Sequence, residues 1–365
     1  MKTAKYIRWL ILSIILSGTM TIHYLHINGG AIYPSVHAVC PLGGLENLWA
    51  WAGGQANLQK LFSGTMTLFF FTLIFALIFG RAFCGNICPF GALQELIGKI
   101  SKKKLKVPGK ADKILRYIKY AVLALITVMA WITATIWVSP YDPWAAFAHI
   151  WSPGGLFGEM RVGFIILIIV IAASVFINRF FCKYLCPAGA MYGVISKLSP
   201  TKIKRDDCSS CGQCSRACPM DIDVSNVNKV KSSECIACGQ CVLACPSKNN
   251  DLRLTVFGMA VKPVVFSLLV VVVFFGSLFI FSQTGLYQVT IPSVETVIKS
   301  GNHLQIIDLR GSMSIKLGAE YVGMELLDFY KLMEIPETVP KETRLKDVVN
   351  HVPGYDFHIM KAIKN

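Results

Sequence analysis

Residues 208–219 read CSSCGQCSRACP and residues 235–246 read CIACGQCVLACP, so the spacing C-x2-C-x2-C-x3-C-P is written twice. Short spacers let three thiolates converge on one face of an iron-sulfur cubane, and Gly212 and Gly239 allow the tight turns. The final Cys-Pro of each copy predicts a helix start that directs its sulfur to the other cluster. Zinc knuckles, the alternative, usually use two C-x2-C pairs and not a doubled triplet. The pattern therefore predicts two 4Fe-4S clusters with crossed ligand sets.

The crossed pattern assigns each of these eight cysteines to one cluster. Cluster one takes Cys208, Cys211, Cys214 and Cys245. Cluster two takes Cys235, Cys238, Cys241 and Cys218. The fourth ligand of each cluster thus comes from the other motif, as in proteins that hold two clusters side by side.

A second cysteine pattern is also duplicated. RAFCGNICPFGALQELIGKIS begins at Arg81, and RFFCKYLCPAGAMYGVISKLS begins at Arg179. Their C-x3-CP motifs contain four cysteines, which we call the membrane cysteines: Cys84, Cys88, Cys182 and Cys186. A helical backbone would place the two sulfurs of each motif one turn apart, and Pro89 and Pro187 fit a first helical turn.

Two symmetric thiol pairs at one membrane depth predict a redox or metal role for the membrane cysteines. They could hold one shared metal or iron-sulfur centre, or act as a dithiol relay, whereas buried structural thiols are the alternative. Cys40, alone in HAVCPLGGLE, is a weaker candidate because a lone cysteine is usually just small and buried. His23, His26 and His37 lie in the same region and could serve a quinone or a haem, although such residues more often sit at the interface with satisfied hydrogen bonds.

Composition predicts a mainly α-helical integral membrane protein. The chain is 54% hydrophobic and 16% charged, which excludes a soluble single domain and a nucleic-acid binder. A helix of about 20 apolar residues crosses a hydrocarbon core. Five runs meet that requirement: 6–25, 62–80, 117–138, 162–178 and 263–282.

The distribution of basic residues predicts the orientation of these runs. Residues 81–119 contain ten Lys and Arg, residues 26–61 contain one, and residues 139–160 contain none. Because cytoplasmic loops keep positive charge, the N-terminus and the cluster-binding module are expected in the cytoplasm, and the tail outside. Each C-x3-CP motif follows a run that leads inward, so the first four runs predict two hairpins of one orientation, related by a pseudo-two-fold axis.

Four segments follow from this organisation. They are a four-helix membrane domain (1–200), a cytoplasmic two-cluster α+β module (201–252), a fifth membrane helix (263–282) and a small extracytoplasmic domain (283–365). In the last segment, LQIIDLRG predicts a strand, and apolar residues then recur at helical spacing until Pro336. They are Ile315, Ala319, Val322, Leu326, Phe329 and Leu332. This segment has no cysteine, so a docking or regulatory role is expected.

The cysteine motifs resemble those of bacterial-type two-cluster ferredoxins. Across residues 1–282, both C-x3-CP motifs included, the chain resembles the NapH/NosR-type membrane polyferredoxins. That resemblance implies an electron-transfer subunit that links the quinone pool or cytoplasmic donors to extracytoplasmic reductases or their maturation. The two SGTMT strings, at 17–21 and 63–67, are similar to covalent flavin sites but lie inside apolar runs, so no FMN site is assigned.

These features predict a protein that passes single electrons between a cytoplasmic or quinone donor and a membrane or extracytoplasmic redox partner. The alternative is a redox-sensing regulatory or assembly factor for an extracytoplasmic reductase. Basic residues beside the clusters could attract an acidic partner such as a ferredoxin or a flavodoxin. They are Lys202, Lys204, Arg205 and Arg216.

Overall fold

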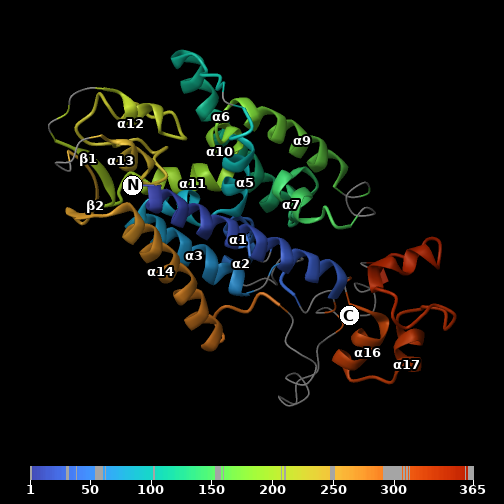
Figure 1. The fold of residues 1–365 in the computed structure, drawn as a ribbon. Coiled ribbons are helices and arrows are strands. Elements are labelled where there is room, and N and C mark those ends of the chain that lie inside the picture. Colours follow the sequence, from blue (N-terminus) through green and yellow to red (C-terminus); the bar gives the residue numbers. More distant parts are fainter. Residues whose placement is uncertain are drawn as a thin grey trace. The chain divides into compact units, whose positions relative to one another are not determined.

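The computed structural model shows a mostly helical protein (Figure 1). It describes residues 2–29, 33–37, 39–53, 61, 63–101, 103–152, 158, 160–206, 208, 211–246, 251–290, 306, 309, 311, 313–357 and 359–360. Two compact units are defined by their internal packing. The first comprises Met1–Thr21 and Val36–Gln288, and the second comprises Ile22–Ser35 and Val289–Asn365.

Helices occupy all five predicted apolar runs. They are α1 (Lys2–Gly29), α3 (Ser63–Phe79), α6 (Gly109–Thr133), α9 (Arg161–Phe176) and α14 (Pro263–Gln283). Among the described residues, three helices are long and apolar enough to cross a membrane, namely those in α1, α6 and α14. The other two, α3 and α9, are apolar but only 17 and 16 residues long.

Helix α6 begins well before the apolar run that predicted it. The run starts at residue 117, whereas the helix starts at Gly109, directly after Pro108. Asp112 and Arg116 form an i,i+4 ion pair of 2.7 Å on the added turns. A pair with this spacing supports a polar helical extension, which hydropathy alone does not detect.

The internal repeat is longer than the two cysteine motifs. The first copy contains α2 (Pro41–Ala52), α3, α4 (Ala82–Asn86) and α5 (Pro89–Ile97), and the second contains α7 (Pro143–Ala148), α9, α10 (Phe180–Tyr184) and α11 (Pro187–Ser196). In the first copy α2 packs along α3, and in the second α7 packs along α9. Both short helices begin with proline, and their N-caps are Cys40 and Asp142. Cys40 and Asp142 therefore occupy equivalent positions.

The segment with the doubled cysteine motif combines short helices and a small sheet. Its elements are β1 (Lys202–Arg205), α12 (Gln213–Arg216), α13 (Gln240–Ala244), β2 (Leu252–Val256) and β3 (Met259–Val261). The strands are antiparallel in the order β1-β2-β3, with Ile203 opposite Leu254. Both side chains are buried in a core that also contains Phe266 and Val270 of α14. This segment, called the ferredoxin module below, thus packs directly on membrane helices.

One local prediction about the module is wrong. Pro219 does not start a helix, because α12 ends at Arg216 and residues 219–220 form a turn. The turn is closed by the Asp221 amide, which donates to the Cys218 carbonyl at 3.1 Å, and Asp221 has a φ of 50° that a continuing helix does not allow. The residues after Pro246 lie outside the described part of the chain.

The C-terminal segment contains two separate helices within the stretch where apolar residues recur at helical spacing. They are α16 (Ile315–Val322) and α17 (Leu326–Leu332), followed by the 3-10 helix η4 (Leu345–Asn350). Gly323 ends α16 with a φ of 74°, a left-handed conformation that favours glycine and stops a helix. Most of the predicted strand LQIIDLRG lies outside the described residues.

Candidate iron-sulfur sites

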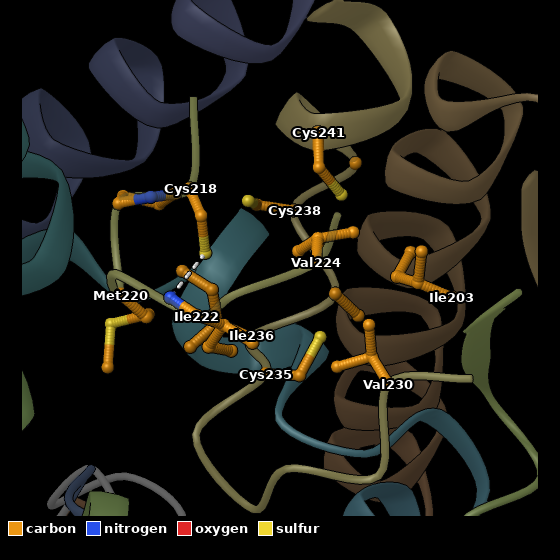
Figure 2. Close-up of a pocket in the computed structure, with 13 residues that line it drawn as sticks. Ile203, Cys218, Met220, Ile222, Val224, Val230, Cys235, Ile236, Cys238 and Cys241 are labelled. Carbon is orange, nitrogen blue, oxygen red and sulfur yellow. Dashed lines mark hydrogen bonds between the residues drawn. The ribbon is translucent and has the colours of Figure 1, made fainter. Parts of the chain in front are cut away.

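Four cysteines surround one hollow of about 360 Å³ in the ferredoxin module (Figure 2). They are Cys218, Cys235, Cys238 and Cys241, the set predicted for cluster two. Most of the remaining wall is aliphatic and includes Ile203, Val224 and Val230. Figure 2 also shows the amide of Ile222, which donates to the Cys218 sulfur at 3.4 Å. The fold thus brings one cysteine of the first motif to three cysteines of the second.

The chemistry of this hollow fits a cluster better than a single metal ion. Burial raises the pKa of Cys218 to about 12 and that of Cys235 to about 11, so ionised sulfurs there need a cationic core. Within the described residues, no group of three or more His, Cys, Asp or Glu side chains is arranged to hold one metal ion. Sulfurs spaced around an apolar hollow suit a 4Fe-4S cubane, whose irons bind thiolates at its corners.

The cluster-one cysteines lie nearer the surface. Cys208 and Cys211 are exposed, whereas Cys214 is buried and Cys245 is half-buried. Cys214 and Cys245 belong to the same packed core. Arg216 donates to the Cys211 carbonyl at 3.1 Å, which places a guanidinium beside this exposed edge.

Each C-x3-CP motif bends at its second cysteine. Cys84 lies inside α4 and Cys182 inside α10, while Cys88 and Cys186 are the N-caps of the following helices. No single helix therefore runs through both cysteines of a motif, whereas Pro89 and Pro187 begin helices, as predicted. The next residue is proline, which disfavours helical geometry in the residue before it and forces a new helix start.

At each bend, the sulfur of the second cysteine accepts a hydrogen bond from a backbone amide of the following helix. The Gly91 amide donates to the Cys88 sulfur at 3.4 Å, and the Gly189 amide donates to the Cys186 sulfur at 3.3 Å. Amide donors of this kind stabilise the thiolate form of a sulfur.

The structure brings the two motifs together. Cys186 lies within electrostatic range of the other three membrane cysteines. Gln94 of the first copy donates to the Cys182 sulfur at 3.3 Å and accepts from the Phe181 amide at 3.0 Å. Arg179 of the second copy donates to the Cys84 carbonyl at 2.6 Å. Four sulfurs from two repeats therefore share one buried site.

The ferredoxin module contacts this site through its cluster-two side. Cys84 packs in one cluster of buried residues with Cys218 and Cys238. A Cβ added to Gly85 would lie 2.2 Å from the Ile236 carbonyl oxygen and 3.2 Å from the Cys238 Cβ. The second copy has Lys183 in place of Gly85, and Lys183 forms an ion pair with Asp221. Both repeats thus contact the loops that contain Cys218 and Cys238.

Replacing Gly85 with alanine is expected to separate these surfaces. Its methyl group would collide with backbone, which cannot rotate away, so we expect a loss of about 1–3 kcal/mol in unfolding free energy. The change should also alter the EPR signal assigned to cluster two. Gly276→Ala in α14, where an added Cβ meets nothing within 4 Å, is the matched control and should be neutral or stabilising. Equal unfolding free energies and equal EPR signals in the two variants would contradict the close contact of Gly85 with Ile236.

Cys40 lies outside both C-x3-CP motifs, and it acts electrostatically on Tyr192 together with Cys84 and Cys186. It caps α2, and burial, with Asp142 as a further contribution, raises its pKa to about 12. Near it, the Ser139 hydroxyl and His37 Nε2 are 2.9 Å apart. His23 and His26 belong to the other compact unit, where His26 Nδ1 lies 2.7 Å from the Tyr33 carbonyl.

Glu46 on α2 predicts a pH-dependent stability. Its side chain is 3% exposed, and burial, assisted by Asp142, raises its pKa to about 8. The folded state therefore binds a proton that the unfolded state releases, so stability falls as pH rises between about 4.5 and 8, by at most about 1.4 kcal/mol per pH unit. We expect Glu46→Gln to flatten this dependence in thermal unfolding. Glu342→Gln, at an exposed position, should leave it unchanged.

Several site residues were not recognised from the sequence. Gln94 and Tyr192 occupy equivalent positions in the two copies and lie beside the membrane cysteines. Glu95 and Glu234 pair with buried arginines that begin the copies. The identical Arg at the start of both copies was the sequence feature that could have indicated the ion pairs.

Comparison with known proteins agrees with this geometry. A 4Fe-4S binding domain is matched twice, at residues 63–108 and 162–206, and a 4Fe-4S dicluster domain is matched at residues 200–246. Each of the first two segments contains the two cysteines of one C-x3-CP motif, and the third contains all eight of the doubled motif. The chain therefore contains segments similar to 4Fe-4S binding domains at both C-x3-CP motifs and at the doubled cysteine motif.

The predicted resemblance to NapH-type proteins is confirmed by individual relatives. The chain is 32% identical over 200 residues to the putative electron transport protein YccM of Escherichia coli, covering 51% of this chain and 54% of that one. It is 29% identical to the ferredoxin-type protein NapH of Haemophilus influenzae, over 40% of this chain and 50% of that one. It is 28% identical to the methylamine utilization ferredoxin-type protein MauN of Methylobacillus flagellatus, over 44% of this chain and 59% of that one.

The chain thus spans little more than half the length of these curated relatives. No solved structure matches it. Its apolar helices and these relatives together indicate a membrane protein.

Proposed function

We propose that this protein conducts single electrons along three iron-sulfur centres placed in series. Cluster one and cluster two are held by the ferredoxin module, and the membrane cysteines hold a third 4Fe-4S centre shared by the two repeats. Bound 4Fe-4S clusters supply one-electron transfer. The contact of Gly85 with Cys238, which joins cluster two to the four-sulfur site, carries this proposal.

The donor set supports a shared third centre. Each matched 4Fe-4S binding segment contributes two cysteines, half of the four thiolates that a 4Fe-4S cluster requires. The buried Arg81 also has Nε and Nη2 groups without an oxygen or nitrogen acceptor among the described residues, and its guanidinium interacts with the Cys84 thiol. Buried cationic donors beside sulfurs fit an anionic cluster at this place.

Differences in burial support the order of the centres. Cys208 and Cys211 are exposed, and Cys218 and Cys238 are buried in one cluster with Cys84. A soluble electron carrier can therefore approach cluster one, while cluster two faces the repeats. The basic 81–119 segment favours a cytoplasmic position for the module, with a membrane or extracytoplasmic partner at the other end.

Rapid mixing with a reduced low-potential ferredoxin tests this function. The anaerobically purified protein should show the ferredoxin-module EPR signals first and a third, slower signal that needs the membrane cysteines. Electron transfer that stops at the module, combined with partner binding that changes with redox state, would instead favour the regulatory or assembly role.

The exposed edge beside Cys211 predicts electrostatic steering of an acidic donor. Arg216→Glu reverses the charge at this edge, so we expect the bimolecular reduction rate to fall several-fold at low salt and the difference to shrink as salt rises. Lys106→Glu, the same charge change at an exposed position in the basic linker, is the control and should leave the rate near wild type. Salt-independent rates in the wild-type protein would refute steering.

A further inference from the structure

A buried arginine from each repeat reaches across to the cysteines of the other repeat. Arg81 and Arg179 begin the two copies, and their exposed fractions are 1% and 0%. Arg179 Nη1 donates to the carbonyl of Cys84 at 2.6 Å. Arg81 lies within electrostatic range of Cys84 in its own copy and of Cys186 in the other.

Two equivalent glycines make room for this crossing. A Cβ on Gly91 would lie 2.9 Å from Arg179 Nη1, and a Cβ on Gly189 would lie 2.8 Å from Arg81 Nη2. These are the same glycines whose amides cap the Cys88 and Cys186 sulfurs. Each guanidinium therefore rests on the first helical turn of the opposite copy, beside its capping sulfur.

Carboxylates also bind both guanidinium groups. Glu95 accepts from Arg179 Nη2 at 2.8 Å and from Nε at 3.2 Å, and Glu234 accepts from Arg81 Nη1 at 3.1 Å. Arg179 also has a φ of 51° and a ψ of 45°. A side chain other than glycine holds this left-handed conformation at an energetic cost, which the surrounding hydrogen bonds must offset.

The ion pair with Glu234 leaves Nε and Nη2 of the buried Arg81 without a hydrogen bond to an oxygen or nitrogen acceptor among the described residues. The guanidinium interacts instead with the Cys84 thiol. Burying a charged donor without an anionic partner is costly. Such donors, placed next to Gly189 and its capped sulfur, point to an anionic group at the four-sulfur site.

We propose that Arg81 and Arg179 are positioning residues that raise the reduction potential of the centre held by the membrane cysteines. This inference rests on the proposed third centre. Four thiolates around a 4Fe-4S core give a net negative charge, and reduction adds one more negative charge. A fixed positive charge in a buried site stabilises the more negative state, because water does not screen it.

The test is an EPR-monitored redox titration of Arg179→Gln, with iron content measured on the same sample. We expect the midpoint potential of the third centre to fall by at least 59 mV, which is a tenfold change for a one-electron couple, with iron retained. Arg179→Lys keeps the charge but not the fork of hydrogen bonds, so its potential should stay near that of wild type. An unchanged potential in Arg179→Gln would overturn the inference.

Two further variants separate charge from structure. Arg81→Gln removes the other guanidinium and should also lower the potential; Glu234 then keeps Lys119, as Glu95 keeps Arg8 in Arg179→Gln, so neither neutral variant leaves an unpaired carboxylate. Arg116→Gln is the matched control, because Arg116 contacts Glu234 at 3.7 Å but is not among the charges that act on the membrane cysteines. The midpoint potential of the third centre in this variant should match that of the wild-type protein.

The outcomes also separate this inference from the proposed function. A wild-type protein without a third EPR signal defeats both proposals. A third signal whose midpoint potential is the same in the wild-type protein and in both neutral variants defeats only the proposed role of the arginines. Loss of iron in both neutral variants, with retention in Arg179→Lys, supports the requirement for positive charge.

Discussion

Cys218→Ser is expected to abolish cluster two while cluster one survives. Cys218 belongs to the first cysteine motif, yet it lines the hollow with Cys235, Cys238 and Cys241. A serine hydroxyl is a poor iron ligand at neutral pH, so about half of the module's iron and its coupled EPR signal should be lost. Iron content and EPR of the dithionite-reduced protein measure both effects. Loss of cluster one instead would refute the crossed ligand sets.

The same variant also tests the order of the centres. Cluster two lies between the exposed cysteines and the repeats, so electrons from a soluble donor should reach cluster one and then stop. We expect reduction of the third centre to fall by at least tenfold. Cys245→Ser is the comparison at the equivalent motif position, and it should spare the cluster-two signal.

Single serine changes at Cys84 and at Cys182 are expected to give one shared phenotype. The two cysteines are far apart in sequence, but Gln94 and Arg179 link their copies at 3.3 Å and 2.6 Å. If all four membrane cysteines hold one cluster, either change should remove the same signal and about four irons, leaving both module clusters intact. EPR and iron analysis would show this. Different spectra for the two variants would indicate separate roles for the two motifs.

Cys40→Ser provides the control for this pair. Cys40 is a half-buried cysteine outside the ferredoxin module, and it caps α2 and lies outside both C-x3-CP motifs. We expect its removal to leave iron content unchanged. A loss of the third signal would extend the ligand set to Cys40.

The apolar runs and cysteine spacings predicted the helices and the clustering of thiols well. These features depend on local sequence: about 20 apolar residues form a membrane-length helix, and short spacers gather thiolates. The helix starts at Pro89 and Pro187 were predicted correctly, whereas the bend at Cys88 depends on the effect of Pro89 on the preceding residue, which the cysteine spacing alone does not show. The start of α6 was missed because its first turns depend on the Asp112–Arg116 pair and not on hydropathy.

The ion pairs beside the four-sulfur site could not be predicted in the same way. Glu95 and Glu234 lie 84 residues before and 153 residues after the arginines they bind. Nothing in their local sequence indicates such partners. The equivalence of Cys40 and Asp142 was hidden as well, because only the two prolines and the helix starts are shared.

Iron and sulfide per chain, measured with EPR on anaerobically purified protein, test the central claim most directly. Three 4Fe-4S centres require about twelve irons and a third EPR signal that disappears in Cys84→Ser. The account predicts that result. About eight irons, with only the two module signals, would contradict it and leave the membrane cysteines as thiols.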